Sequence, residues 1–254
     1  MEFEVSDPLA RYAGALVGAV ALVTGAGSGI GRAMAVAFAR AGADVALLGR
    51  DEERLSATAA TVEAAGARAV TVAADVTDAR AVDEAVARTV ESLGTPRIAV
   101  ANAGVNAWAE LSELDAATLR AALATNVEGV ANVARSVAPG MRDAGGGKIL
   151  VVASDNGRRP EPGGSGYVAS KFGAVGLALS LAQELLADGI GVHVIEPGCV
   201  DTEWYPPDED APRDRMLRPE DVALVALFLA TLPAGIVLDE VLMQPRALML
   251  EPWD

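Results

Sequence analysis

A serine, a tyrosine and a lysine are spaced in this chain as a proton-transfer site would require. Tyr167 follows Ser154 after thirteen positions, and Lys171 follows Tyr167 after four more. The apolar-periodic run from Tyr167 predicts a helix, on which positions four apart share one face with Cβ atoms about 5–6 Å apart. An ammonium about 4 Å from the phenol would favour the phenolate by roughly 4 kcal/mol before opposing desolvation. We therefore expect Lys171 to lower the pKa of Tyr167 towards neutrality, where a phenol can act as acid or base.

Ser154 follows the apolar run 148–153, which predicts a buried strand. Its hydroxyl would then lie at the carboxyl end of that strand, where it can polarise a carbonyl group. A tyrosine and a lysine at this spacing also occur by chance on many helices, so the assignment depends on the rest of the chain.

A glycine-rich loop near the start of the chain predicts a dinucleotide site. The run 19–24 is typical of a buried parallel strand, and a helical pattern that ends at Gly42 follows the loop. Glycines permit a tight turn and close approach to a pyrophosphate, while the helix N-terminus favours its negative charge. The expected cofactor contacts are Gly25, Gly27, Ser28, Gly29, Ile30 and Gly31. A purely structural glycine turn is the alternative.

Arg50 follows the second predicted strand, 43–49, and favours NADP(H) over NAD(H). At this place an acidic residue usually binds the ribose 2′-hydroxyl of NAD, whereas an arginine suits a 2′-phosphate. The three acidic residues 51–53 leave NAD(H) possible. They also fit the first turn of the helix predicted over 51–65, where acidic side chains complement the helix dipole.

Later strand ends supply further candidates for the cofactor site. Asp75 and Val76 follow the predicted strand 68–73 and would meet the adenine ring. Asn102, Ala103 and Gly104 follow the strand 97–101, where small residues would let the backbone approach the nicotinamide side; a simple turn is the alternative. Asn126 lies in an otherwise apolar helical region, 115–144, where a buried amide usually serves packing and hydrogen bonding.

Two segments are candidates for contact with a substrate. Residues 201–218 are polar, proline-rich and aromatic, which is typical of a lid, and Trp204 and Tyr205 would contact the substrate. After Ser154, the charged residues Asp155, Arg158, Arg159 and Glu161 would form a charged pocket wall. A solvated loop is the other interpretation of these charges.

The order of these elements predicts an α/β fold: one Rossmann-type, doubly wound parallel sheet of about seven strands flanked by helices. The 254 residues fit a single domain, 1–254, with a leader over 1–18. Helices are also expected over 78–92, over 165–188 and from residue 218, and strands over 189–196 and 239–244.

Composition excludes several classes of protein. A formal net charge of −15 argues against a nucleic-acid partner or an anionic membrane surface. The uncharged stretch 12–31 contains six glycines, so we interpret it as a strand and loop rather than a membrane span. One cysteine, Cys199, permits no internal disulfide, and one histidine, His193, makes a metal site improbable. We expect a cytoplasmic protein with a small-molecule substrate.

These motifs together resemble the short-chain dehydrogenase/reductase (SDR) family over nearly the whole chain from about residue 16. In chain order the matching motifs are TGAGSGIG at 24–31, Asp75, NAG at 102–104, Asn126, Ser154, YVASK at 167–171 and PGCVDT at 197–202. The chain departs from the family's usual pattern at Ala101, Ala153 and Asp155. The first two departures retain the functional residue of each pair, whereas Asp155 bears on substrate choice.

The resemblance implies a role for each matching residue. Tyr167 would be the general acid and base, Lys171 would lower its pKa and hold the nicotinamide ribose, and Ser154 would orient the carbonyl or alcohol. Asn126 would hold a water molecule in a proton relay. Further cofactor contacts are implied at Pro197, Gly198, Val200 and Thr202, the last with the nicotinamide carboxamide.

The expected activity is therefore an NADP(H)-dependent oxidoreductase of the ketoreductase or alcohol dehydrogenase type. It would interconvert a ketone or aldehyde and an alcohol by hydride transfer. The alternative is a non-catalytic nucleotide-binding regulator or scaffold of the same fold, although such proteins usually lose the tyrosine or the lysine. The family also implies a homotetramer or homodimer, assembled through the helical regions 115–144 and 165–188.

Overall fold

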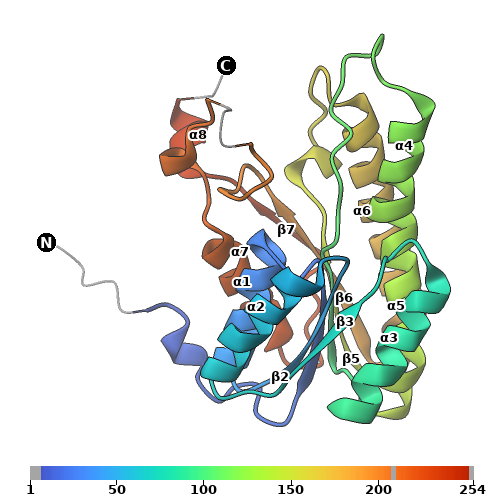
Figure 1. The fold of residues 1–254 in the computed structure, drawn as a ribbon, viewed down its shortest axis with the longest axis vertical. Coiled ribbons are helices and arrows are strands. Elements are labelled where there is room, and N and C mark those ends of the chain that lie inside the picture. Colours follow the sequence, from blue (N-terminus) through green and yellow to red (C-terminus); the bar gives the residue numbers. More distant parts are fainter. Residues whose placement is uncertain (1–6, 207–209, 252–254) are drawn as a thin grey trace, which may run out of the picture.

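Seven parallel strands form a single twisted sheet in the order β3-β2-β1-β4-β5-β6-β7 (Figure 1). The computed structural model describes residues 7–206 and 210–251. The strands are β1 Val20–Thr24, β2 Asp44–Gly49, β3 Ala69–Ala73, β4 Ile98–Ala101, β5 Gly147–Val152, β6 Ile190–Pro197 and β7 Glu240–Met243. The predicted fold class, a Rossmann-type doubly wound sheet in one domain, is confirmed.

Helices cover both faces of this sheet. They are α1 Gly29–Arg40, α2 Glu52–Ala64, α3 Ala79–Ser92, α4 Ala116–Leu123, α5 Gly129–Asp143, α6 Ser165–Leu185, α7 Pro219–Ala230 and α8 Arg246–Leu250. Short 3₁₀ turns are η1 Ala10–Tyr12, η3 Asp155–Gly157, η4 Leu186–Asp188 and η5 Arg213–Arg215, and η2 Ala124–Glu128 is a π-turn. The helical region expected over 115–144 is thus interrupted by η2, and the sequence did not predict α8.

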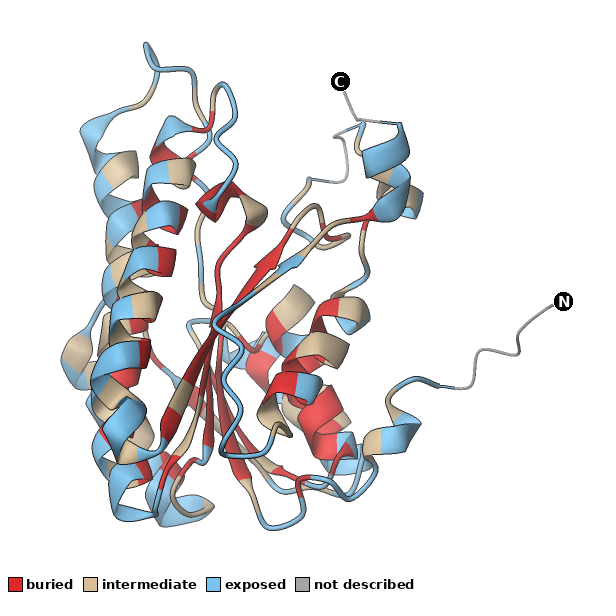
Figure 2. Cartoon of the chain, turned by 180° about the vertical axis from the view of Figure 1, so that it is seen from behind, coloured by how far each residue is buried: buried red, intermediate tan, exposed pale blue. Residues whose placement is uncertain are grey.

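The core has two halves, one on each side of the sheet. Alternate residues of a strand point to opposite faces, so Ala21 and Val23 of β1 pack with α1, α2 and α7, while Leu22 packs with α3, α5 and α6. Figure 2 shows the strands buried along most of their length and the helices buried on their inner sides. Burial on both faces explains why these strands are continuous apolar runs in the sequence.

Aspartates fix the start of three helices. The side chains of Asp51, Asp78 and Asp115 each accept hydrogen bonds from backbone N–H groups in the first turn of α2, α3 and α4 respectively. Each bond satisfies a donor that the helix itself leaves without a partner. The acidic residues Glu52 and Glu53 occupy the first turn of α2, as one of the two interpretations of residues 51–53 predicted.

The strand order reverses between β1 and β4, because the chain builds β2 and β3 on one side of β1 before it returns to the other side. Ligands of such sheets bind beyond the carboxyl ends of the strands at this switch point. The described part of the expected leader, 7–18, packs on the body of the domain: Leu16 is buried, and its N–H donates to the carbonyl of Ala41. Within 7–206 and 210–251, no helix is long and apolar enough to cross a membrane.

Candidate active site

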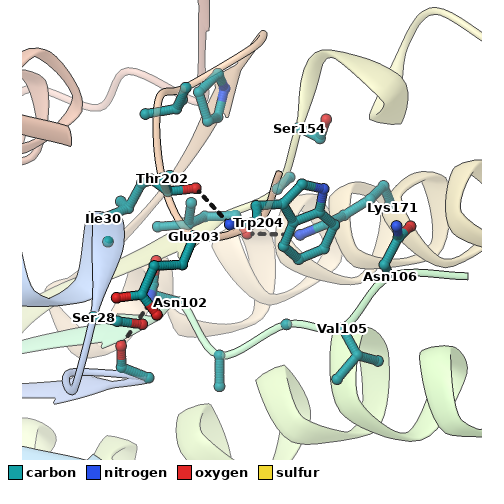
Figure 3. Close-up of a pocket in the computed structure, with 18 of the residues that line it drawn as sticks. Ser28, Ile30, Asn102, Val105, Asn106, Ser154, Lys171, Thr202, Glu203 and Trp204 are labelled. Atoms are coloured by element: carbon teal, nitrogen blue, oxygen red, sulfur yellow. Dashed lines mark hydrogen bonds between the residues drawn. The ribbon is translucent and has the colours of Figure 1, made fainter. Parts of the chain in front are cut away.

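A cavity of about 1600 Å³ lies beyond the carboxyl ends of the strands, at the switch point. We call its two ends the glycine-loop end, lined by residues within 25–30, 49–55, 74–76 and 102–104, and the tyrosine end, lined by 152–156, Arg159, Glu161, Tyr167, Lys171 and residues within 105–108, 197–206 and 244–249. Figure 3 shows side chains from both ends, with Ser28 and Asn102 of the glycine-loop end on one side and Lys171 and Ser154 of the tyrosine end on the other. The volume is ample for a dinucleotide together with a small substrate.

The glycine-loop end forms a cradle of backbone at the start of α1. Gly25 and Gly29 have φ angles of 63° and 48°, a conformation that side chains disfavour. A Cβ atom on Gly31 would lie 2.3 Å from the carbonyl oxygen of Gly25, so only glycine fits there. Ser28 makes no side-chain cap to α1, which leaves the first turn of the helix for an anionic ligand.

This cradle fits the pyrophosphate of a dinucleotide. Of the six loop residues predicted to contact it, Gly25, Gly27, Ser28, Gly29 and Ile30 line the cavity. Gly31 does not line it; the residue packs behind the loop, against Gly25.

Arg50 and Asp75 lie together where the adenosine half of a dinucleotide would be expected. The Arg50 guanidinium is 3.9 Å from the Asp75 carboxylate and is largely exposed. Hydrogen bonds from Thr77, with a smaller contribution from Arg50, hold the pKa of Asp75 below its usual value against the opposing effect of burial. Val76 also lines the cavity, and so does Asp51, which the sequence left open as a ribose contact.

The segment 102–104 connects the two ends of the cavity. The Asn102 amide donates to the Thr24 carbonyl at 2.9 Å, and its backbone N–H donates to the Thr24 hydroxyl at 3.0 Å. These bonds hold the end of β4 against the end of β1. Asn102, Ala103 and Gly104 all line the cavity, as predicted from the small residues that follow β4.

Asn126 lies inside the π-turn η2 and is buried, with an exposed fraction of 2%. Its amide donates to the carbonyl of Val105 at 3.0 Å and to the hydroxyl of Ser170 at 2.8 Å, and its oxygen accepts from the N–H of Val105 at 2.9 Å. The residue does not line the cavity. These contacts match the packing role that a buried amide predicts, and they fix the backbone beside Lys171.

Tyr167 and Lys171 lie on the first turns of α6, and both side chains reach the cavity. The Lys171 nitrogen is 5.6 Å from the centre of the Tyr167 ring and donates to the carbonyl of Val152 at 3.2 Å. The contact expected from their spacing is thus confirmed. Lys171 is buried and Tyr167 is half-buried, and this loss of solvent has a large effect on their ionisation.

The expectation that Lys171 lowers the pKa of Tyr167 is wrong for this structure. Burial raises the pKa of Tyr167 to about 12, and the charge of Asp155 acts in the same direction, whereas a hydrogen bond with Ser154 acts against it. Burial also lowers the pKa of Lys171 to about 8. Desolvation therefore outweighs attraction between the two groups, because each neutral form is favoured in the interior.

Ser154 lies at the carboxyl end of β5, as predicted, and begins the turn η3. Its hydroxyl oxygen accepts from the N–H of Asn156 at 3.2 Å, and the hydroxyl is also 3.2 Å from the Asp155 carboxylate, to which it donates. The Asp155 carboxylate in turn accepts a bond of 2.9 Å from the Gln244 amide. Ser154, Asp155 and Tyr167 therefore form one connected polar group at the tyrosine end.

Two tryptophans flank the ring of Tyr167. The ring centres of Trp204 and Trp108 lie 5.5 Å and 6.2 Å from that of Tyr167. Trp204 and Tyr205, for which the sequence predicted contact with a substrate, line the cavity, and so does Thr202. Trp108 was not predicted; its place soon after the NAG motif and the scarcity of aromatic residues, 4% of the chain, were the available signals.

Arg158 does not line the cavity, so the prediction that it contacts the substrate is wrong. Its guanidinium instead pairs with Glu196 of β6, at 3.4 Å, and with Glu240 of β7. The physical reason is that the Glu196 side chain, with 2% of its surface exposed, needs a counter-charge in the interior. Arg159 and Glu161 line the cavity in its place.

The structure adds several residues that sequence reasoning did not identify. Gln244, Pro245, Leu248 and Met249, from the segment around α8, line the tyrosine end, as does Cys199 after β6. Pro197, Gly198 and Val200, where the family resemblance implied cofactor contacts, line it as well. The four around α8 carry no motif, and only the path of the chain brings them to the site.

Residues 207–209 of the expected lid lie outside the described residues. Among the described residues, no three His, Cys, Asp or Glu side chains gather as a metal site.

Known proteins that are similar to this chain include a reductase, an oxidoreductase and a dehydrogenase. Glycine betaine reductase ATRR of Emericella nidulans is 35% identical over 242 residues, which cover 92% of this chain and 19% of that protein; the chain thus spans about a fifth of its length. An NAD-dependent oxidoreductase of Mycobacterium tuberculosis is 38% identical over 209 residues, which cover 77% of this chain and 76% of that protein. The structure of an alcohol dehydrogenase from the archaeon Thermococcus sibiricus, complexed with 5-hydroxy-NADP, matches with a TM-score of 0.83 at 30% identity and covers 89% of this chain and 96% of that one.

A family model of the short chain dehydrogenases matches residues 19–211, from the first strand into the loop after β6. This range contains the glycine loop, the NAG segment, Ser154, Tyr167 and Lys171, and the resemblance inferred from the motifs is confirmed. The chain belongs to the short-chain dehydrogenase/reductase family of NAD(P)-dependent oxidoreductases.

Proposed function

We propose that this protein is an NADP(H)-dependent carbonyl reductase or alcohol dehydrogenase. It interconverts a ketone or aldehyde and an alcohol by hydride transfer, with Tyr167 as the general acid and base. The observation that carries the proposal is the position of Ser154, Tyr167 and Lys171 in the same cavity as the glycine cradle. A dinucleotide bound along the cradle would extend to the three side chains and supply the hydride.

The side chains have separate tasks. In the reductive direction the Tyr167 hydroxyl donates a proton to the carbonyl oxygen, while a bound reduced dinucleotide would supply the hydride to the carbonyl carbon. Ser154 orients that oxygen by a hydrogen bond. Lys171 holds the nicotinamide ribose and stabilises the phenolate that remains on Tyr167. Asn126, whose side-chain amide is bonded to Val105 and Ser170, supports the site by fixing the backbone beside Lys171. The oxidative direction reverses each step.

The high pKa of Tyr167 bears on the direction of the reaction. A phenol with a pKa of about 12 is neutral at pH 7 and therefore ready to donate a proton to a carbonyl oxygen. Alcohol oxidation requires the phenolate, which is favoured only when Lys171 is protonated and Ser154 donates to the oxygen. We therefore propose that the neutral Tyr167 phenol is the proton donor when the protein reduces a carbonyl group near neutral pH.

NADP(H) is the proposed cofactor because Arg50 lies at the cavity beside Asp75, at the place where a 2′-phosphate is usually bound. Cofactor contacts are proposed for the glycine loop and for the segments at Asp75–Val76, 102–104 and 197–202. The names of the matched proteins include both cofactors: an NAD-dependent oxidoreductase and a structure with 5-hydroxy-NADP. Arg50 is therefore the residue on which the preference depends.

We also propose a homodimer or homotetramer in the cytoplasm. The helices α4 and α6 expose the large apolar side chains Leu123 and Phe172, whose exposed fractions are 37% and 43%. A second copy of the chain would cover them. A monomeric mass by sedimentation at micromolar concentration would reject this part of the proposal.

The test combines cofactor titration with turnover. The purified protein is titrated calorimetrically with NADPH and NADH, as wild type and as Arg50→Asp. It is then assayed for NADPH oxidation over a panel of ketones and aldehydes. We expect NADPH to bind more tightly than NADH, and Arg50→Asp to remove that preference.

We expect Tyr167→Phe to lower kcat by about 10²- to 10⁴-fold while NADPH binding persists. The matched control is Tyr12→Phe, because Tyr12 lies in η1 and does not line the cavity. Near-native turnover in Tyr167→Phe would reject the mechanism. Tight cofactor binding by the wild type without turnover of any substrate would instead favour a nucleotide-binding regulator.

A further inference from the structure

The tyrosine end of the cavity has aromatic walls that are held in place. The Trp108 ring packs against the backbone of Gly163 and Gly164, where a Cβ atom would lie 3.0 Å and 2.9 Å from the ring. The N–H of Ala109 donates to the carbonyl of Gly163 and fixes the same loop. Trp108 and Trp204 nevertheless expose 44% and 41% of their surface. Their positions are thus set while much of each side chain stays open to a ligand.

The same end carries negative charge. Asp155 and Glu161 line the cavity, and neither forms an ion pair with a described residue. Their charges converge on Cys199, which also lines the cavity: the pKa of its thiol is raised by burial and further by the two carboxylates, against a hydrogen bond with Tyr205. The two carboxylates would therefore attract a positively charged ligand to this end of the cavity.

Asp155 is already hydrogen-bonded within the protein. One carboxylate oxygen accepts from Ser154 and the other from the Gln244 amide. These bonds orient the carboxylate and reduce its need for another donor. It would act on a ligand mainly through its charge, which suits a cation without N–H groups. Such a cation is also the kind that aromatic faces bind best, because it is weakly hydrated.

Two basic residues of this end oppose the carboxylates. Lys171 lines the cavity, but its ammonium already donates to the carbonyl of Val152. Arg159 also lines this end. Its side chain is exposed, whereas Asp155 is only partly exposed and adjoins Ser154. The charge of Asp155 reaches the Tyr167 hydroxyl, and those of Asp155 and Glu161 both reach Cys199. Asp155, which is hydrogen-bonded to Ser154, is therefore the carboxylate best placed to act on a ligand at the reacting atoms.

We propose that the tyrosine end selects a substrate that carries a quaternary ammonium group next to its reacting carbonyl or alcohol carbon. Trp108 and Trp204 contact the ammonium methyl groups through their rings, and Asp155, assisted by Glu161, supplies the opposite charge. This inference rests on the function proposed above and names the substrate class of that same site. Asp155 is its specificity-determining residue.

The experiment compares three aldehydes of similar size with NADPH and NADH: trimethylammonioacetaldehyde, its neutral carbon isostere 3,3-dimethylbutanal, and the anionic 4-oxobutanoate. We expect kcat/KM for the cationic aldehyde to exceed that for the neutral isostere by at least about tenfold. A ratio of one or less, with measurable turnover of the neutral aldehyde, would overturn the inference and leave the oxidoreductase function intact. Preference for 4-oxobutanoate would also overturn the inference, and would indicate that Arg159 sets the charge preference of this end of the cavity.

Matched variants test the residues. Asp155→Asn keeps the shape of the side chain and removes its charge, so the cation-to-neutral ratio should fall by about tenfold; an unchanged ratio would reject its role. Trp108→Leu, which keeps an apolar wall, should lower the same ratio. The control is Glu113→Gln, an exposed carboxylate outside the cavity, which should leave the ratio within about twofold.

A binding measurement separates this inference from the proposed function. Tryptophan fluorescence of the NADP⁺-loaded protein is followed during titration with the trimethylammonium alcohol and with 3,3-dimethylbutan-1-ol. Selective binding of the cation without turnover of any aldehyde would support the cation site and reject the enzymatic function. Binding of neither alcohol, without turnover, would reject both.

Discussion

The two ends of the cavity are built from different parts of the chain. The glycine-loop end consists mainly of backbone and small residues that directly follow strands β1, β3 and β4. The tyrosine end also begins at strand ends, but its walls are large side chains from loops and from the segment around α8. One end is therefore fixed by local backbone geometry, and the other by how distant segments pack.

This difference between the two ends indicates in which part of the cavity sequence variation is tolerated. A cradle made of backbone permits almost no added atom, as the 2.3 Å approach at Gly31 shows. Walls made of side chains on loops can change without disturbing the sheet, and they decide which substrate fits. We expect substitutions at the glycine-loop end to affect folding and cofactor binding together, and substitutions at the tyrosine end to affect selectivity.

The largest effect is expected for Gly31→Ala, which tests the glycine-loop end. The new methyl group would collide with the Gly25 carbonyl and the Asn102 amide, so the loop must move. We expect a loss of about 3 kcal/mol of unfolding free energy, at the upper end of typical overpacking, and a weakening of NADPH binding by at least tenfold. Urea denaturation and calorimetry measure the two effects.

The matched control is Gly176→Ala in α6. Nothing lies within 4 Å of a Cβ atom placed there, so alanine should stabilise the helix by about 0.5–1 kcal/mol and leave cofactor binding unchanged. Equal stability of Gly31→Ala and the wild type would show that the cradle is not rigid, and the contrast between the two ends would not hold.

The sequence predicted the two ends with unequal success, for a physical reason. A strand followed by alternating glycines has few possible conformations, so the cradle and the sheet followed from local pattern. Trp108 and Met249 reach the tyrosine end only because the tertiary fold brings their loops there, which no local pattern encodes. The pKa of Tyr167 was mispredicted because spacing reveals a neighbouring charge but not the depth of burial.

Arg158 is a single-residue example of a side-chain direction that the sequence pattern did not predict correctly. Its place in a charged loop after Ser154 predicted a contact with the substrate, yet it turns towards Glu196, which pattern alone placed inside a strand without assigning it a partner. A single residue separates Arg158 from Arg159, which does line the cavity. The direction of a loop side chain depends on the packing beneath it.

The second prediction, Arg158→Met, tests whether Arg158 stabilises the fold while its neighbour Arg159 acts on substrate selectivity. The substitution leaves the Glu196 carboxylate buried without its counter-charge. Because Arg158 is itself partly exposed, we expect the free energy of unfolding to fall by only about 2 kcal/mol. Chemical denaturation measures it. The double variant Arg158→Met/Glu196→Gln should recover most of the loss, because the unpaired charge is then gone.

The neighbouring variant Arg159→Met is the control for Arg158→Met. Arg159 forms no ion pair with the described residues, so its removal should change stability by less than about 0.5 kcal/mol. It should instead alter KM for charged aldehydes, because the side chain lines the cavity. A large stability loss in Arg159→Met and none in Arg158→Met would reverse the roles assigned here.

The last effect is the pH dependence that Lys171 confers at the tyrosine end. Its folded pKa of about 8 lies below the ordinary value of 10.5, so between these values the unfolded chain binds more protons than the folded chain. Stability of the cofactor-free protein should therefore rise as the pH increases from about 8 to 10, by at most about 1.4 kcal/mol per pH unit. Above pH 10 the raised pKa of Tyr167 acts in the opposite direction, since its folded form then retains the proton that the unfolded chain loses.

Denaturation at pH 7.5, 8.5 and 9.5 of the wild type and of Lys171→Met isolates this contribution. The variant should lack the rise due to Lys171, while the smaller effect of the half-buried Lys148, whose pKa burial also lowers, remains in both proteins. Parallel curves would mean that the Lys171 ammonium keeps its charge in the fold at no cost. In that case the charge of Lys171 would act on Tyr167 without the cofactor, and the tyrosine end would be prepared for proton transfer by its own side chains, as the glycine-loop end is prepared for the pyrophosphate by its backbone.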